Sequence, residues 1–291
     1  SPFLSNAMRG SASNVYHEWQ TDSLRGATAN RQIEGDDATA TAFTATTRVG
    51  NYCQISEYTV SVSGTQRAMN HAGTADEYSY QLAKGGRTIK RDMEHALTRN
   101  QASSAGGAAT ARSLASLESW LATNYVSEGT GTAQTTPGFA SGTVAAPTDS
   151  TVAGTFEKAS LDTAIQNCWT QGGDPKMVMV GPFNKTKISG FAGIATLYKD
   201  VPGLQQATII GAADYYVSNF GQHAIVANRF QRDETALVLD MEYLGVAFLR
   251  NMETNPLAKT GDADRSQVIC EFTLEVKNEA ASSKVTDLTT S

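Results

Sequence analysis

The sequence has too little cysteine for a disulfide framework. Its three cysteines, Cys53, Cys168 and Cys270, are widely separated, odd in number and form no C-x-x-C pair. Disulfide-stapled domains instead carry an even set of cysteines at short spacings. We therefore expect each cysteine to be a small buried apolar residue, because free cysteine is among the residue types most often buried.

Long apolar runs and an excess of positive charge are also missing. No run of eighteen apolar residues occurs, and no basic segment followed by an apolar one stands at the N-terminus. We therefore expect a soluble chain that is not exported and does not enter a membrane. Only 18% of the residues are charged and the net charge is −6. A chain of this kind lacks the basic surface that grips nucleic-acid phosphates tightly.

One motif resembles half of a zinc site. The segment HEWQTD, from His17 to Asp22, begins like H-E-x-x-H, in which two histidines four apart on a helix hold the metal. Its fifth position is Thr21, so the second imidazole is missing. One histidine beside carboxylates binds zinc poorly, since zinc favours several nitrogen or sulfur ligands. We expect no metal at this segment.

Other fragments of cofactor motifs fail on spacing. The pair Asp262 and Asp264 begins like a calcium loop, but Gln267 stands where that loop needs glycine and Thr273 where it needs glutamate. Lys185 and Thr186 are only the end of a phosphate loop, and the GTGT stretch lacks the third glycine of a dinucleotide loop. We expect no cofactor and identify no catalytic residues.

The N-terminal quarter has too few large apolar residues to form a core. Residues 1–16 are small and polar, which predicts an extended arm. Residues 24–57 are equally poor in large apolar side chains. Residues 58–63 then alternate apolar and polar, the period of a strand with one covered face. Together they predict a long two-stranded excursion, which is marginal in isolation and must be covered by something else.

A long helix follows. Thr74 and Glu77 have the spacing of a capping box, and apolar residues recur at helical intervals to about Arg99. Gly85 and Gly86 interrupt this pattern, at a cost of about 1 kcal/mol each relative to alanine. We expect a kink or close backbone packing at these glycines. His95 lies among charged residues, and we expect it on the helix surface.

The rest of the chain predicts an α+β fold. We expect a short helix around residues 114–121 and a strand at 176–180 followed by a helix beginning near Lys185. The last third predicts mainly strands, with a loop at 250–266 between the final two. The last strand alternates apolar with mostly polar residues, and its apolar positions are Val268, Cys270, Phe272, Leu274 and Val276. A further helix begins near residue 156, and its expected buried face is formed by Leu161, Ala164, Ile165, Cys168 and Trp169.

The order of these elements resembles the major capsid proteins of tailed bacteriophages, which have the Hong Kong 97 type fold. Eight segments, in order along nearly the whole chain, are similar to the family typified by podoviruses of the SU-ten kind. They are PFLS, HEWQTDSL, VSGTQ, KRDMEHAL, YYVSNFG, NRF, LAKTGDADRSQ and EFTLEVKNE. The resemblance implies an N-terminal arm (1–16), an E-loop hairpin (17–66), a spine helix and peripheral segment with a Gly/Thr-rich loop (67–150), an axial domain (151–232) and peripheral strands with the C-terminal tail (233–291).

The resemblance also implies the function and the partners. Identical subunits would assemble as hexamers and pentamers into an icosahedral virion shell, in the host cytoplasm, around double-stranded DNA that is enclosed without sequence-specific binding. A portal protein and scaffolding or decoration proteins are further implied partners. No lysine, asparagine and glutamate set for a covalent crosslink is identified. The implied inter-subunit contacts are Trp19, Asp22, Arg25, Arg31, Glu34, Arg48, Lys259, Asp262, Asp264 and Arg265.

Two other interpretations remain open from the sequence. An encapsulin-like compartment shares the fold but encloses protein cargo. A soluble enzyme would place Lys185, Asp162 or His223 in a cleft. For the residues of the E-loop itself, an ordinary solvated loop is the alternative to a subunit contact. Electron microscopy would separate both kinds of shell from the enzyme.

Overall fold

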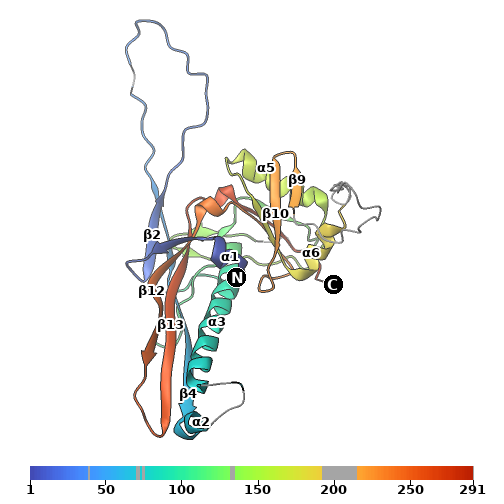
Figure 1. Cartoon of the computed structure of the whole chain (residues 1–291). Coiled ribbons are helices and arrows are strands. Elements are labelled where there is room, and N and C mark those ends of the chain that lie inside the picture. Colours follow the sequence, from blue (N-terminus) through green and yellow to red (C-terminus); the bar gives the residue numbers. More distant parts are fainter. Residues whose placement is uncertain (39, 70–72, 74–75, 132–134, 192–214, 291) are drawn as a thin grey trace, which may run out of the picture.

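The computed structural model describes residues 1–38, 40–69, 73, 76–131, 135–191 and 215–290. The molecule is elongated (Figure 1). A four-stranded sheet and a long helix run toward one end, and a loop projects from the other. A six-stranded sheet with its helices lies to one side. The architecture is mixed α/β, in agreement with the predicted α+β class.

The four-stranded sheet is mostly antiparallel. Its order is β1 (Met8–Ser11), β12 (Leu244–Pro256), β13 (Ala263–Val276) and β4 (Gln54–Ser63). Only β1 and β12 run parallel. The predicted alternation in β13 is confirmed, because Val268, Cys270, Phe272, Leu274 and Val276 all pack into one hydrophobic core. This first core also contains the buried side of the long helix.

The long helix, α3 (Glu77–Thr98), lies along this sheet (Figure 1). Its N-cap is Asp76, whose carboxylate accepts the N–H groups of Tyr78 and Ser79. Thr74, the expected cap, lies outside the described residues. A Cβ at Gly85 would come within 2.6 Å of the Tyr58 ring, so the expectation of close backbone packing is confirmed there. A Cβ at Gly86 would make only ordinary contact.

The six-stranded sheet separates the first core from a second one. Strand β11 (Ala236–Leu239) is buried on both faces: Leu237 and Leu239 enter the first core, and Ala236 and Val238 enter the second. Successive side chains of a strand point to opposite faces, so one strand can serve both cores. The sheet order is β5 (Tyr125–Ser127), β14 (Ser283–Thr286), β11, β8 (Met177–Val180), β10 (Gly221–Ala227) and β9 (Tyr215–Ser218).

Two helices contribute to the second core. They are α5 (Lys158–Thr170) and α6 (Pro182–Ser189). Trp169 was expected on the buried face of α5, but it is 57% exposed. Helix α6 begins at Pro182 rather than near Lys185, because proline is well suited to the first turn of a helix. The other four apolar residues predicted for the α5 face are fully buried.

The N-terminal residues are not an extended arm. Residues Pro2–Asn6 form a short helix, α1, and β1 follows it and joins the sheet. Phe3 is fully buried in the first core. Two buried apolar side chains, Phe3 and Leu4, were enough to dock a segment that looked polar overall. The loop expected at residues 250–266 is also shorter, since β12 continues to Pro256 and β13 begins at Ala263.

The remaining elements are short. They are β2 (Tyr16–Thr21), β3 (Thr47–Tyr52), α2 (Gly64–Ala68), α4 (Leu117–Trp120), β6 (Phe139–Ala140), β7 (Thr143–Val144), η1 (Met241–Tyr243) and η2 (Glu279–Ala281). The three cysteines are buried and free, and His95 is exposed, as predicted. Among the helices in the described ranges, none has the length and apolar character needed to span a lipid bilayer.

Candidate assembly surfaces

A loop without a core of its own projects from the molecule. Strands β2 and β3 form an antiparallel stem, and residues 22–46, here called the projecting loop, extend beyond it (Figure 1). Its three large apolar side chains are exposed: Leu24 by 98%, Ile33 by 77% and Phe43 by 91%. The excursion is narrower than predicted, because β4 pairs with β13 in the four-stranded sheet and takes no part in it.

The apex of the projecting loop is a tight turn. The N–H of Asp36 donates to the carbonyl of Ile33 at 3.3 Å, and Gly35 has φ +81°. A positive φ of this size favours glycine, so the turn is specified by the sequence. The expected contact residues Arg31 and Glu34 lie at this apex and are exposed.

The other expected contact residues of this region lie nearer the stem. The Arg25 guanidinium donates to Thr28 Oγ1, and the Asp22 carboxylate accepts the N–H of Ser23 at 2.8 Å. Arg48 forms a two-point ion pair with Glu18, with bonds of 2.6 and 2.7 Å. Arg48 therefore has a partner within its own chain, across the two strands of the stem.

HEWQTD lies in strand β2 and not in a helix. Successive side chains of a strand point to opposite faces, so His17 and Glu18 cannot approach one metal ion together. His17 instead lies 3.4 Å from the Glu275 carboxylate, and this interaction lowers the pKa of Glu275. Within the described ranges, no three His, Cys, Asp or Glu side chains gather as metal ligands would.

Trp19 anchors the stem to the body of the same chain. Its indole Nε1 donates to the carbonyl of Val276 at 2.9 Å. Its ring centroid lies 5.5 Å from that of Trp120, which in turn stacks on Phe139 at 5.6 Å. Trp19 is thus half-buried by its own subunit, and its packing fixes the direction in which the stem leaves the body.

A groove of about 1040 Å³ lies beside the stem. Trp120 and Phe139 form an aromatic wall, and Val276 and Tyr243 add apolar surface. Charged residues also line it. The Glu279 carboxylate accepts the N–H groups of Ala122 and Thr123, which also line the groove. Asp22 and Lys277 lie near the exposed edge of the groove.

The opposite end of the molecule carries an ion cluster. Asp264, at the start of β13, pairs with both Lys259 and Arg67, and Arg67 also lies 3.7 Å from Asp76. The hydrogen bond from Lys259 and then that from Arg67 hold the pKa of Asp264 below its usual value. The structure therefore pairs two of the expected contact residues, Lys259 and Asp264, directly, and it adds Arg67, a cation that the sequence did not indicate.

The two other expected contact residues at this end are Asp262 and Arg265. The carbonyl of Asp262 accepts the N–H of Gly64 at 3.0 Å, which joins the β12–β13 turn to the start of α2. Arg265 is exposed and stands opposite Ser61 in the β13–β4 register.

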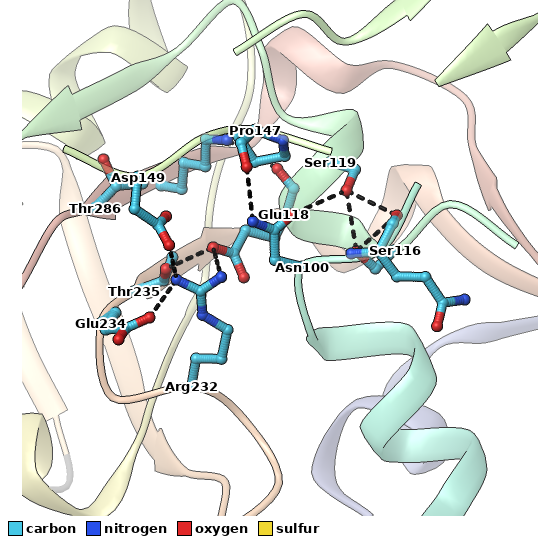
Figure 2. Close-up of polar contacts among 12 residues, drawn as sticks. Asn100, Ser116, Glu118, Ser119, Pro147, Asp149, Arg232, Glu234, Thr235 and Thr286 are labelled. Carbon is cyan, nitrogen blue, oxygen red and sulfur yellow. Dashed lines mark hydrogen bonds and ion pairs between the residues drawn. The ribbon is translucent and has the colours of Figure 1, made fainter. Parts of the chain in front are cut away.

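A polar network links α4 to the segment that precedes β11. Figure 2 shows Arg232 among the carboxylates of Glu118, Asp149 and Glu234. Burial raises the pKa of Glu118, which is only 1% exposed, and Thr235 donates to it at 2.8 Å. The sequence did not indicate this cluster, because its members are far apart along the chain and belong to no motif.

Lys284 belongs to the same buried region. It is fully buried on β14, and its Nζ donates to the carbonyl of Glu118 at 2.8 Å. Burial lowers the pKa of Lys284 to about 8. The charges at this junction connect α4 to the six-stranded sheet, and their role is structural.

The residues named for an enzymatic interpretation do not form a reactive cleft. His223 is 1% exposed, and its two ring nitrogens contact Ser218 and the carbonyl of Pro175. Desolvation lowers its pKa. Lys185 donates to the carbonyl of Ile225, and Asp162 accepts from Tyr216. Each of the three side chains therefore holds neighbouring elements together.

Comparison with solved structures shows which fold the chain has. A structure from Mycobacterium phage Adephagia matches with a TM-score of 0.60 at 11% identity, covering 100% of this chain and 91% of that one. The procapsid of satellite phage P4, which includes a size determination protein, matches with a TM-score of 0.58 at 13% identity over 99% of this chain and 88% of that one. The fold is that of tailed-phage capsid subunits.

The sequence gives the family. The SU10 major capsid protein model matches residues 1–289, so the chain belongs to that family. A major capsid protein of Escherichia phage Phieco32 is 35% identical over 102 residues, which are 35% of this chain and 29% of that protein. The match thus spans less than a third of this relative. This family is one of structural capsid proteins and not of enzymes.

Proposed function

We propose that identical copies of this chain assemble as hexamers and pentamers into an icosahedral shell that encloses double-stranded DNA. One observation carries the proposal: the projecting loop exposes its large apolar side chains and has no body of its own chain against which to bury them. Removing these apolar side chains from water would be favourable, because apolar surface is stabilised by burial. A neighbouring copy would cover it at every position of a closed shell.

Different regions of the chain would have different roles in this shell. Residues 17–66 would form the E-loop, with its functional part in the projecting loop, and α3 would be the spine. Residues 151–232 would belong to the axial domain at the fivefold and sixfold axes. The sheet of β12, β13 and β4 would be peripheral, and its distal ion cluster would lie near threefold contacts.

The expected contact residues would act in different ways. Arg31, Glu34, Arg25 and Asp22 on the projecting loop carry mixed charges and would set the register on a neighbour. Exposed ion pairs contribute only about 0 to 1 kcal/mol each, so their effect would be orientation more than affinity. Trp19 and Arg48 would act indirectly by holding the stem. The distal set is Lys259, Asp262, Asp264 and Arg265.

Other proteins would bind the assembling shell rather than the isolated subunit. A portal protein and scaffolding or decoration proteins are the expected kinds. The structurally similar P4 procapsid includes a size determination protein, which supports an accessory protein of this type. With net charge −6, the chain suits a container that confines DNA without gripping it.

The proposal is tested by shortening the loop. Thr21 and Thr47 are paired across the stem, so replacing residues 22–46 with Asn-Gly would close it as a two-residue hairpin. The unaltered chain, expressed alone, is expected to form closed shells in negative-stain electron microscopy. The shortened chain is expected to stay folded by circular dichroism and unassembled. Shells of normal yield from the shortened chain would refute the role of the loop.

An encapsulin-like compartment is the second candidate. It predicts the same shells but protein cargo inside them. Membership of the SU10 family favours the phage shell. Terminase and portal genes beside the gene for this chain would support the phage assignment, and a cargo-protein gene in their place would oppose it.

A further inference from the structure

The exposed side of α3 carries a row of cations. Lys84, Arg87 and Arg91 are spaced three and four residues apart, so they lie on one side of the helix, and Lys90 lies on its flank. All four side chains are exposed, whereas the opposite side of the helix packs into the first core. These four residues are here called the cationic row.

The cationic row has no carboxylate partners. Among the described residues, no side chain of the row takes part in an ion pair or a hydrogen bond. The Arg91 guanidinium lies instead over the ring of Phe230, at 5.4 Å from its centroid. Like charges four residues apart, such as those of Arg87 and Arg91, destabilise a helix. An anion from outside the subunit would relieve this repulsion.

The other face of the four-stranded sheet has a different charge arrangement. Successive side chains of a strand point to opposite faces. Cys270 of β13 points toward α3, where its Sγ lies 3.8 Å from Met93 Sδ, so Glu271 points away from the helix. Glu271 is paired there with two cations, Arg112 and Arg250. These cations are thus neutralised on one side of the sheet, while the cationic row is unpaired on the other.

A nucleic-acid duplex fits the cationic row better than a protein partner does. The centre of a protein interface is poor in charged residues, whereas the row concentrates four charges beside the aromatic ring of Tyr80. From Lys84 to Arg91 the helix rises about 10 Å at 1.5 Å per residue. A duplex carries one charge per about 1.7 Å of its axis, so about six phosphates lie within that length. Arginine also matches phosphate oxygens with a planar fork of donors.

We propose that the exposed side of α3 contacts the sugar-phosphate backbone of the DNA inside the shell. The guanidinium groups of Arg87 and Arg91 and the ammonium groups of Lys84 and Lys90 bind phosphate oxygens. This inference rests on the proposed function, which places duplex DNA within the shell. It deepens that function by naming the side of the subunit that faces the DNA. Four phosphate contacts give weak, salt-sensitive binding that reads no sequence, which agrees with a container of net charge −6.

Binding of a short fluorescent duplex to the full-length chain tests the contact. Anisotropy is measured at low salt and at protein concentrations below those at which shells form. Four phosphate contacts predict that log K falls with log salt with a slope of about −3.6, which is about −0.9 for each contact. The triple variant Lys84→Gln, Arg87→Gln and Arg91→Gln keeps one contact. Its slope is expected near about −1, with affinity lower by about tenfold or more. No duplex binding by the unaltered chain would overturn the inference.

The matched control removes the same number of positive charges elsewhere. Lys158, Lys176 and Lys187 are exposed on or near α5 and α6. Changing all three to glutamine is expected to leave the affinity and the slope as they are in the unaltered chain. An equal loss in this variant would overturn the inference, because it would show that only total charge matters.

A competing polyanion separates DNA from an acidic protein partner. Poly-glutamate is expected to bind the unaltered chain less tightly than the duplex at the same salt concentration, because the duplex has the higher density of charge along its axis. Tighter binding of poly-glutamate would overturn the assignment to DNA in favour of an acidic polypeptide.

The orientation of the subunit gives an independent test that needs no variant. Cryo-electron microscopy of shells formed by the unaltered chain is expected to place the cationic row on the inner surface. Shells with this side of α3 on the outer surface, or covered by a neighbouring subunit, would overturn the inference and leave the proposed function standing. A chain that forms no shell would overturn the proposed function itself.

Discussion

The carboxylate of Glu94, in the middle of the molecule, accepts a 2.8 Å hydrogen bond from the backbone N–H of Phe3. Its other oxygen accepts the N–H of Leu4 at 2.9 Å. The oxygen that Phe3 contacts also accepts a hydrogen bond from the Asn228 amide, at 2.9 Å. Glu94 is fully buried on α3. One carboxylate therefore joins the N-terminal helix, the long helix and the turn after β10, which come from three distant parts of the chain.

Replacing this carboxylate should loosen the N-terminus. In Glu94→Gln an amide NH₂ would face backbone N–H groups, which leaves at least one buried donor unsatisfied. We expect the free energy of unfolding to fall by about 1–3 kcal/mol in chemical denaturation. Amide exchange at Phe3 and Leu4 should become faster. Asp92→Asn, on the exposed side of the same helix, is the control, and equal effects of both variants would contradict this role of Glu94.

Trp19 should matter through its own subunit first. Trp19→Ala removes the ring contact with Trp120 and the bond to Val276, and it should cost about 2 kcal/mol of stability because the side chain is only half-buried. The stem would then lose its fixed direction, so shell yield in electron microscopy should drop. Trp19→Phe keeps the ring and should retain most of that yield. Normal shells from Trp19→Ala would count against the stem as an assembly determinant.

The buried Lys284 predicts an unusual pH dependence. Its pKa in the folded chain is about 8, against an ordinary value of 10.5. Between these values the unfolded chain binds more protons than the folded one, so the free energy of unfolding should rise with pH. One such group can raise the free energy of unfolding by at most about 1.4 kcal/mol per pH unit. Thermal unfolding of the subunit from pH 7.5 to 9.5 measures it.

The matched variants for this prediction are lysine to methionine changes. Lys284→Met should abolish the rise, since no proton remains to be exchanged at this position. Lys277→Met, at an exposed position, should keep it. The same slope in both variants would show that other groups cause the pH dependence.

The distal ion cluster should affect assembly more than subunit stability. The two partners of Asp264, Lys259 and Arg67, are exposed, so their ion pairs with it add little to folding. Asp264→Asn is therefore expected to leave the melting temperature of the subunit unchanged and to reduce the yield of closed shells. Glu253→Gln, on the exposed part of β12, is the control. A lower melting temperature with normal shells would show that the cluster stabilises the subunit and not the assembly.

The sequence predicted elements whose pattern is local. The alternation in β13, the helical spacing in α3 and the buried face of α5 each follow from apolar periodicity, and only Trp169 departed from it. The scarcity of large apolar residues also identified the region of the projecting loop. These predictions succeeded because apolar periodicity and local composition depend only on residues that are close together in the sequence.

Features that depend on distant residues could not be predicted in this way. The burial of Phe3 requires the cavity that α3 provides, and the pairing of β4 with β13 joins segments about two hundred residues apart. The network around Arg232 forms only after residues far apart in the sequence, such as Glu118 and Arg232, meet in the folded chain. The contact residues on the projecting loop remain a prediction, because their partners would lie in another copy of the chain.

The central claim is that the projecting loop is completed by a neighbouring subunit. A cryo-electron microscopy reconstruction of the chain, purified after expression alone, tests it most directly. We expect closed icosahedral shells in which residues 22–46 of every subunit lie on the next subunit and Leu24, Ile33 and Phe43 lose most of their exposure. Discrete monomers at high concentration, with this loop packed against their own body, would contradict the account.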